Sequence, residues 1–120
     1  VKRDPEVLRS FFTDNAIYQN CGMPASIGVD AILANLTAQF GMFPDSYEYV
    51  MKNIAADGTT VLTERLDMIS TPTGIQGLPV MGTFVLEDGK IRRWHDYFDV
   101  ALSGKMMKGE DVSTLIPQAY

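Results

Sequence analysis

The chain has very few of the residues on which metal sites and thiol chemistry depend. Only one of its 120 residues is cysteine, Cys21, and only one is histidine, His95. A single cysteine excludes an internal disulfide, and the Cys/His set of a zinc site cannot be assembled from these two residues. Glycine-rich phosphate loops and the G-x-S-x-G elbow of serine hydrolases are also absent. Any catalysis must therefore depend on carboxylates, phenols, amides and arginine.

Basic residues and long apolar runs are scarce as well. Ten Lys and Arg stand against fifteen Asp and Glu, the net charge is −5, and the basic residues are scattered. The electrostatic signature of nucleic-acid binding is therefore missing. No apolar run reaches the roughly 18 residues that span a bilayer, and no basic-then-apolar leader opens the sequence. We expect a cytoplasmic protein with no nucleic-acid or membrane partner, whose ligands are apolar or neutral.

Two helices are predicted in the first half of the chain. Asp4 suits an N-cap and Pro5 the first helical position, which predicts a short helix that ends near Thr13. A second helix is predicted from Asp30 and closed by Pro44, because its apolar residues recur at helical spacing. These apolar residues are Ile32, Leu33, Leu36, Phe40 and Phe43.

The remaining pattern is mostly that of strands. A short strand is predicted over residues 16–20, and four longer ones follow the second helix. They cover residues 47–56, 60–70, 77–87 and 90–100. Turn signals separate these four strands, so we predict an antiparallel meander, followed by a tail from residue 101 that is rich in Gly, Lys and Met. Helices followed by antiparallel strands indicate one α+β domain over residues 1–120, with helices packed on one face of a curved sheet.

Two charged residues interrupt an otherwise apolar strand face. Strand side chains alternate between the faces of a sheet, so Arg65 and Asp67 share a face with Val61, Thr63 and Ile69. A solvated ion pair is the ordinary interpretation of such residues. The flanking Val61 and Ile69 argue against full exposure.

The last strand carries a carboxylate between two aromatic residues, since Asp96 shares its face with Trp94 and Phe98. Such a carboxylate either reaches solvent at an edge or is buried for a purpose, and the strand alone does not decide between them. On the first predicted strand, Tyr18 and Asn20 likewise share one face. If these faces converge, they form an apolar cavity with a few polar groups, which is the usual form of a small-molecule site.

The walls of such a cavity would come from the same strand faces and from the second helix. They are Phe43, Ile69, Leu78, Val80, Trp94 and Phe98. Isolated buried charges are costly and must be paired or neutralised, and two aspartates, one arginine and one shared proton sum to zero. Repulsion between like charges favours the protonated form of one carboxyl and the anionic form of the other. The group would then provide an acid and a base together.

Three segments, "IYQN", "TERLD" and "WHDYFD", resemble the limonene-1,2-epoxide hydrolase family in their order and separation. The similarity runs from about Ala16 to Val100 and includes "GVDAI" and "GTFVLEDGKI". It implies the cone-shaped α+β fold shared with ketosteroid isomerase, in which a curved, mainly antiparallel sheet and helices on its inner face enclose a deep apolar pocket. That family has a further helix ahead of "DPEVLRSFF", which we expect this domain to lack.

The resemblance also implies a reaction and a role for each polar residue. The family opens a hydrophobic epoxide to a vicinal diol by direct attack of water, with an Asp-Arg-Asp group and no covalent intermediate, metal or cofactor. In this sequence Asp96 would be the general base on a water also held by Tyr18 and Asn20. Asp67 would protonate the epoxide oxygen, and Arg65 would bridge the two carboxylates.

Two other functions remain open on these residues. One is an isomerase or dehydratase of the same fold, in which Asp96 abstracts a carbon-bound proton and Tyr18 holds an oxyanion. Arg65 between two acids fits this alternative less well. The other is a non-catalytic module that binds lipophilic molecules.

The opposite face of the predicted sheet is apolar too. Its side chains are Leu62, Leu66, Met68, Met81 and Val85. A sheet with two apolar faces needs cover on both. We therefore expect a homodimer, which the resemblance also suggests.

Overall fold

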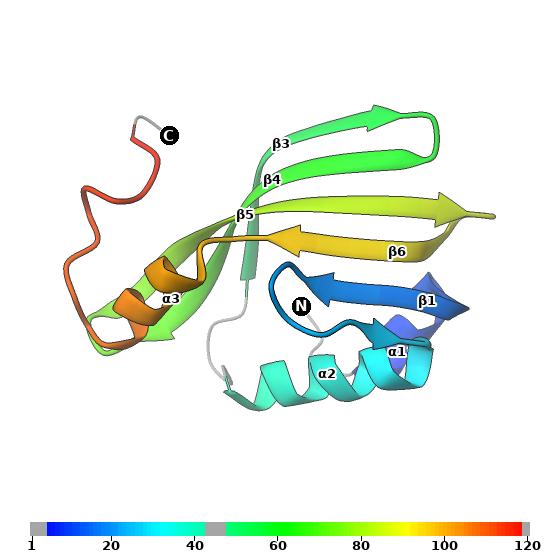
Figure 1. Ribbon diagram of the computed structural model, residues 1–120, viewed down its shortest axis with the longest axis horizontal. Coiled ribbons are helices and arrows are strands. Elements are labelled where there is room, and N and C mark those ends of the chain that lie inside the picture. The colour runs from blue at the N-terminus through cyan, green and yellow to red at the C-terminus, as the bar shows by residue number, and fades with distance from the viewer. Residues whose placement is uncertain (1–4, 43–47, 119–120) are drawn as a thin grey trace.

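The computed structural model describes residues 5–42 and 48–118, which form three α-helices, one 3₁₀ helix and six strands (Figure 1). In chain order they are α1 (Pro5–Leu8), η1 (Arg9–Phe11), β1 (Phe12–Asn20), β2 (Ser26–Ile27), α2 (Val29–Met42), β3 (Glu48–Asp57), β4 (Thr60–Thr71), β5 (Gly74–Glu87), β6 (Lys90–Tyr97) and α3 (Val100–Met107). The predicted second helix and the four long strands agree with α2 and β3 to β6 within a few residues. None of the helices in the described ranges is long and apolar enough to cross a membrane.

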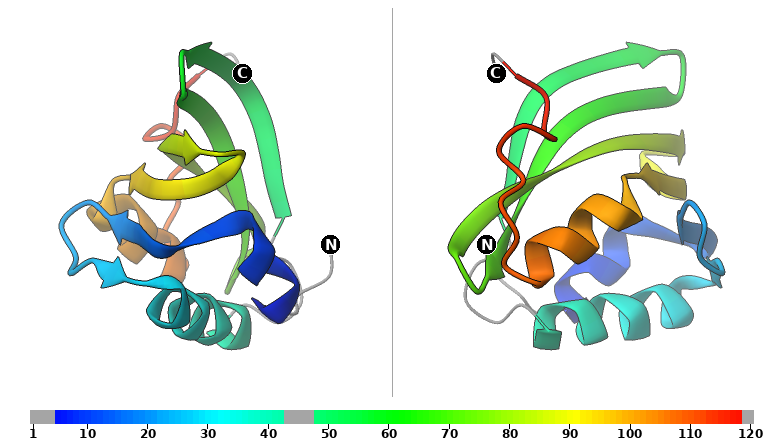
Figure 2. Two further views of the ribbon diagram at one scale, coloured as in Figure 1. Left: turned by 90° about the vertical axis from the view of Figure 1, so that its right-hand side faces the viewer. Right: turned by 60° about the vertical axis from the view of Figure 1, so that its left-hand side comes forward.

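All six strands belong to one sheet in the order β2-β1-β6-β5-β4-β3. The strands β3 to β6 form the predicted antiparallel meander, which is confirmed. On the other side of β6, β1 pairs with it in parallel, so the sheet is mixed. The sheet is strongly curved, and α2 and α3 lie on its concave side (Figures 1 and 2). The predicted α+β class, a curved and mainly antiparallel sheet with helices on its inner face, is therefore correct.

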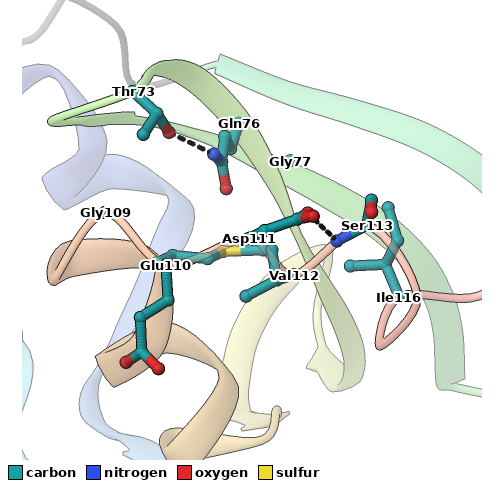
Figure 3. A pocket seen from close by; sticks show the side chains of 10 residues that line it. Thr73, Gln76, Gly77, Gly109, Glu110, Asp111, Val112, Ser113 and Ile116 are labelled. Atoms are coloured by element: carbon teal, nitrogen blue, oxygen red, sulfur yellow. Dashed lines mark hydrogen bonds between the residues drawn. The ribbon is translucent and has the colours of Figure 1, made fainter.

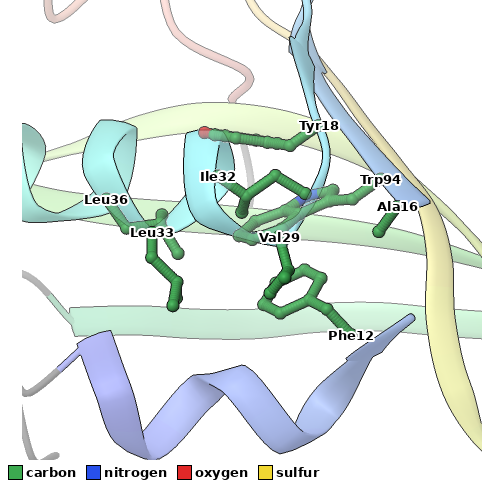
Figure 4. Packing of buried hydrophobic residues seen from close by; sticks show 8 residues of the cluster. All are labelled: Phe12, Ala16, Tyr18, Val29, Ile32, Leu33, Leu36 and Trp94. Carbon is green, nitrogen blue, oxygen red and sulfur yellow. The ribbon is translucent and has the colours of Figure 1, made fainter. Parts of the chain in front are cut away.

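Two apolar clusters hold these helices against the sheet. In the first, Ile32 and Leu36 of α2 are 0% and 1% exposed and belong to one cluster with Trp94 of β6 (Figure 4). In the second, Leu102 and Met106 of α3 pack with residues of β4 and β5. Full burial of one such side chain stabilises the fold by about 1.5–3 kcal/mol. Each helix therefore has its own anchor on a different part of the sheet.

The predicted end of the first helix near Thr13 is wrong. The helical residues end at Phe11, and β1 already begins at Phe12, which pairs with Ile91 of β6. Phe12 is only 4% exposed, because it belongs to the cluster under α2. Pairing within the sheet and burial of the Phe12 ring outweigh the helical spacing of the apolar residues in this segment. The strand predicted over 16–20 is therefore the second half of a longer strand, β1.

The tail, to which the sequence analysis assigned no element, begins with a helix, α3, which covers residues 100–107. Asp99 is its N-cap, and its side chain accepts a hydrogen bond from the backbone N–H of Leu102 at 3.1 Å. Leu102 and Met106, one turn apart, are buried. Gly104 inside the helix obscures the signal, since glycine costs about 1 kcal/mol relative to alanine at such a position. An N-cap residue, Asp99, followed by apolar residues one helical turn apart is the sequence pattern that indicates this helix.

Candidate active site

Arg65 lies between two aspartates, Asp67 beside it on β4 and Asp96 on β6. Its Nε and Nη2 donate to the two oxygens of Asp67, both at 3.0 Å. Its Nη1 and Nη2 donate to the two oxygens of Asp96 at 3.1 and 3.0 Å. The exposed fractions of Arg65, Asp67 and Asp96 are 2%, 6% and 4%. We call these three residues the ion triad; it joins two strands that are separated in the sheet by β5.

Gly82 provides the space through which Arg65 reaches across β5. It pairs with Thr63 of β4 and with Asp96 of β6. A Cβ atom at this position would lie 2.5 Å from Nη1 of Arg65 and 2.8 Å from Oδ1 of Asp96, closer than non-bonded atoms approach. Gly82 is a functional position that the sequence analysis missed. A glycine inside a strand often marks such a close approach, and this was the available signal.

Trp94 supports Asp96 from the apolar core. Its indole N–H donates to Oδ1 of Asp96 at 2.7 Å. Its ring centroid lies 4.4 Å from that of Tyr18 and 5.3 Å from that of Phe84. The structure therefore places Trp94 in the cluster under α2 and not in the predicted cavity wall. Oδ1 of Asp96 accepts hydrogen bonds from Trp94 and Arg65, whereas Oδ2 accepts one from Arg65. Oδ2 is therefore the oxygen that accepts fewer hydrogen bonds.

A cavity of about 380 Å³ opens over the ion triad. Its polar lining includes Tyr18, Asn20, Asp67 and Asp96, four of the predicted site residues. Its apolar lining includes Ile69, Leu78, Val80 and Phe98, four of the predicted wall residues. Arg65 lies behind the two carboxylates and is not part of the lining. Phe43, also predicted for the wall, lies outside the described residues.

Further lining residues come from segments that strand alternation does not address. The apolar ones are Met23, Pro24, Met42 and Met107, and the polar ones are Asn35, Gln39 and Ser103. Nε2 of Gln39 donates to the Tyr18 hydroxyl oxygen and to Oδ1 of Asn35, both at 3.0 Å. The Tyr18 hydroxyl in turn donates to Oδ1 of Asn20 at 3.4 Å. Gln39 stands one helical turn after Asn35, beside the apolar stripe of α2. This spacing of two amides on one side of the helix is the sequence signal for the chain of hydrogen bonds.

Burial changes the ionisation of the polar groups in this cavity. Burial raises the pKa of Asp67 above its ordinary range, although the hydrogen bonds from Arg65 act in the opposite direction. For Arg65, burial would lower the pKa, but the hydrogen bonds to the two aspartates raise it, so the guanidinium keeps its charge. Burial also raises the pKa of Tyr18, which stays a neutral phenol. Burial therefore makes Asp67 easier to protonate than an exposed aspartate.

The arrangement can move protons to and from a neutral bound molecule. Asp67 and Asp96 lie on the same cavity, and Arg65 contacts both, so a donor and an acceptor of protons can act on one ligand. In the part of the chain that the structure describes, no group of three or more His, Cys, Asp or Glu side chains is placed to hold a metal ion. The chemistry available here is general acid–base catalysis.

Comparisons with known proteins identify the family of the chain. The family model described as the limonene-1,2-epoxide hydrolase catalytic domain matches residues 5–109. The chain is 36% identical over 101 residues to the epoxide hydrolase EphG of Mycobacterium tuberculosis (strain ATCC 25618 / H37Rv), with 81% of this chain covered. The matched part is 64% of that relative, so the chain spans less than two thirds of its length.

Solved structures share the fold. The structure of an LEH-like epoxide hydrolase from M. tuberculosis is similar with a TM-score of 0.73 and 29% identity, over 96% of this chain and 85% of that one. An NTF2-like protein of unknown function from Burkholderia pseudomallei K96243 has a TM-score of 0.75 at 12% identity, over 88% and 86% of the two chains. The second similarity concerns the fold alone.

Gly82→Ala is expected to disrupt the ion triad. The added methyl group would overlap the Arg65 guanidinium, so we expect the free energy of unfolding to fall by about 1–3 kcal/mol in urea denaturation followed by circular dichroism. Gly104→Ala in α3 is the matched control, because a Cβ there meets nothing within 4 Å. It should raise stability by about 0.5–1 kcal/mol. Equal losses in the two variants would contradict the role of Gly82.

The stability contributed by Asp67 is expected to decrease as pH rises. Because burial raises the pKa of Asp67, the folded protein keeps a proton that the unfolded chain releases. Its contribution is therefore complete below the unfolded pKa and is lost as pH rises through the folded pKa, with a slope of up to about 1.4 kcal/mol per pH unit. Urea denaturation at a series of pH values should show the difference between the parent protein and Asp67→Asn shrinking over this window. A difference independent of pH would contradict it.

Proposed function

The chain belongs to the limonene-1,2-epoxide hydrolase family, and on this basis we propose that it hydrolyses a hydrophobic epoxide to a vicinal diol. The observation that carries the proposal is the buried ion triad at the wall of an apolar cavity. Water attacks one epoxide carbon while the epoxide oxygen is protonated, in one step and without a covalent intermediate. The reaction needs no metal or cofactor, because the strained ring supplies the driving force and the two carboxyls supply the proton transfers.

Asp96 acts as the general base. Among the described residues, its Oδ2 accepts a hydrogen bond only from Arg65, at 3.0 Å, so a lone pair remains for a proton of the attacking water. That water has two protons and two lone pairs, and one lone pair must stay free to form the bond to carbon. Asp96 takes one proton, and Tyr18 and Asn20, which also line the cavity, hold the remaining hydrogen bonds. The water is thereby oriented as well as activated.

Asp67 acts as the general acid. The alkoxide of an opening epoxide is a poor leaving group unless it is protonated as the carbon–oxygen bond breaks. We assign the shared proton to Asp67, whose pKa is raised by burial, and this proton is donated to the epoxide oxygen. After the step, Asp96 holds the proton taken from water and Asp67 is the anion. The triad is neutral before and after, and the proton returns to Asp67 before the next turnover.

Arg65 is a positioning residue for both carboxyls. It donates two hydrogen bonds to each of them, which fixes their orientation at the cavity wall. Its fixed positive charge also keeps the buried group neutral while the proton changes place. Because it is not part of the cavity lining, it performs this role without contacting the substrate.

The cavity favours a small, hydrophobic epoxide. Its volume of about 380 Å³ lies at the lower end of small-molecule sites, which range from about 300 to 1,000 Å³. The walls are aliphatic and aromatic, with Met23, Met42 and Met107 at the side of the helices and loops. Methionine side chains adapt to irregular shapes. Apolar shape, more than a pattern of hydrogen bonds, would select the substrate.

A second copy of the chain is the partner that we propose for the outer face of the sheet. Leu62 and Met81 on that face are 46% and 49% exposed, and the neighbouring Ile54 is 65% exposed. The three line one shallow surface pocket. Exposed apolar side chains gathered in this way are typical of an interaction site, and two such faces can cover each other in a two-fold dimer.

Asp96→Asn and Asp67→Asn are each expected to lower epoxide turnover by at least about a hundred-fold, because a positioned acid or base contributes about 10²–10⁴-fold. The carboxamide keeps the size of the side chain but performs neither proton transfer. Diol formation from a panel of cyclic and aryl epoxides, followed by chiral chromatography, measures the loss, and circular dichroism checks the fold. Asp14→Asn, exposed on β1, is the matched control and should keep the parent rate. A near-parent rate in either site variant would refute the mechanism.

Isotopically labelled water distinguishes direct attack from a covalent route. With enzyme in excess over epoxide, we expect the label in the diol of the first turnover, because the attacking oxygen comes from water. In a covalent route an unlabelled carboxylate oxygen would enter the diol first. Mass spectrometry of the diol from a single turnover measures this. Unlabelled diol would exclude the one-step reaction.

A further inference from the structure

The guanidinium of Arg65 lies over the ring of Tyr49, a residue of β3. The centre of the ring is 5.0 Å from Cζ of Arg65, within the distance at which a cation is attracted to the face of an aromatic ring. Tyr49 pairs with Asp67 across β3 and β4, so its side chain leaves the sheet on the face that carries the ion triad. The ring therefore contacts the central residue of the triad from a strand that contributes none of its members.

Hydrogen bonds already occupy the whole edge of the Arg65 guanidinium. Its five N–H groups lie in one plane, and each has an acceptor. Four of them donate to the two aspartates, and the fifth, on Nη1, donates to Oγ1 of Thr63 at 3.4 Å. Only the two faces of the planar group are left for further contacts. A ring on one face adds an attraction and opposes a tilt that would move the N–H groups out of line with the carboxyls.

Arg65 is enclosed by protein although the strand beside it is the edge of the sheet. β3 is the last strand in the sheet order, and nine of its ten residues are exposed. Arg65 is nevertheless only 2% exposed. Neither the active-site cavity nor the larger cavity between the start of β5 and the segment that follows α3 (Figure 3) has Arg65 in its lining. Tyr49 is the only aromatic residue of β3, and its ring covers the guanidinium on the side of this open edge.

We propose that Tyr49 is a positioning residue for Arg65, whose ring holds the guanidinium in line with both carboxyls and separates it from solvent at the edge of the sheet. The inference rests on the proposed function, because it assigns Tyr49 to the acid–base step of the same site. Tyr49 is not among the described lining residues of the active-site cavity, so it acts through Arg65 and not on the substrate. Loss of the ring should therefore slow the chemical step and leave substrate binding unchanged.

Proton–nitrogen correlation NMR of the Arg65 side chain tests the contact without any substrate. In Tyr49→Leu the Nε–H signal of Arg65 should move, because the ring current is lost, and this proton should exchange with water about five-fold faster or more. Tyr49→Phe keeps the ring and should keep the signal position and the exchange rate of the parent. Phe11→Leu is the matched control, because Phe11 is 54% exposed, against 41% for Tyr49, and lies outside the active-site lining and the cluster under α2. It should change neither quantity.

Steady-state hydrolysis of cyclohexene oxide tests the role of Tyr49 in the reaction. Tyr49→Leu should lower kcat by about five-fold or more and leave KM within about two-fold of the parent value. Tyr49→Phe and Phe11→Leu should keep the parent kcat. Circular dichroism checks the fold, and Tyr49→Thr replaces the leucine variant if that variant does not fold, because strands accept threonine well.

The two measurements separate failure of this inference from failure of the proposed function. A parent protein that hydrolyses none of the epoxides in the panel would contradict the proposed function, and the NMR comparison would still decide whether Tyr49 holds Arg65. Four results would overturn the inference: an unchanged Arg65 signal and exchange rate in Tyr49→Leu, an unchanged kcat in that variant, a loss confined to KM, or equal losses of kcat in Tyr49→Leu and Tyr49→Phe.

Discussion

The pairing of Arg65 with both Asp67 and Asp96 is the interaction on which the rest of the site depends. Three ionisable groups that are almost fully buried persist only if they satisfy one another, because unpaired charge inside a protein is very costly. The guanidinium does this with two hydrogen bonds to each carboxyl. That geometry requires a strand without a side chain between the two acids, which explains Gly82, and a donor under Asp96, which explains the position of Trp94.

The curved sheet and its helices supply the surroundings that make this pairing useful. The inward face of β4 to β6 carries the triad, while α2 and α3 cover different parts of the concave side. Gln39 of α2 orients the Tyr18 hydroxyl, and Met107 of α3 completes the apolar wall. Both carboxyls are almost fully buried, and burial raises the pKa of Asp67. The helices thus contribute to the chemistry by controlling solvation.

Where sequence patterns failed, a contact distant in the chain was responsible. The first helix ends early because Phe12 pairs with β6 and is buried under α2, although its spacing is helical. Trp94 has the same strand parity as the cavity residues, but its ring fills the core between Tyr18 and Phe84 and only its N–H reaches Asp96. Gln39 lies on a helix whose rotation about its axis depends on packing against the sheet. None of these outcomes follows from local spacing.

The sequence by itself determined which side chains share a face of each strand, because alternation is a property of the extended backbone and needs no other part of the chain. It therefore indicated that Arg65 and Asp67 share one face and that Asp96 shares a face with Trp94 and Phe98, and that two aspartates and one arginine balance with one shared proton. That these faces converge on the concave side was decided by the tertiary structure. Only the tertiary structure decided that the guanidinium spans β5 at Gly82, which oxygen of Asp96 stays accessible, and where the cavity ends. These features depend on strand order, register and helix packing, which are set by burial of the whole core and not by neighbouring residues.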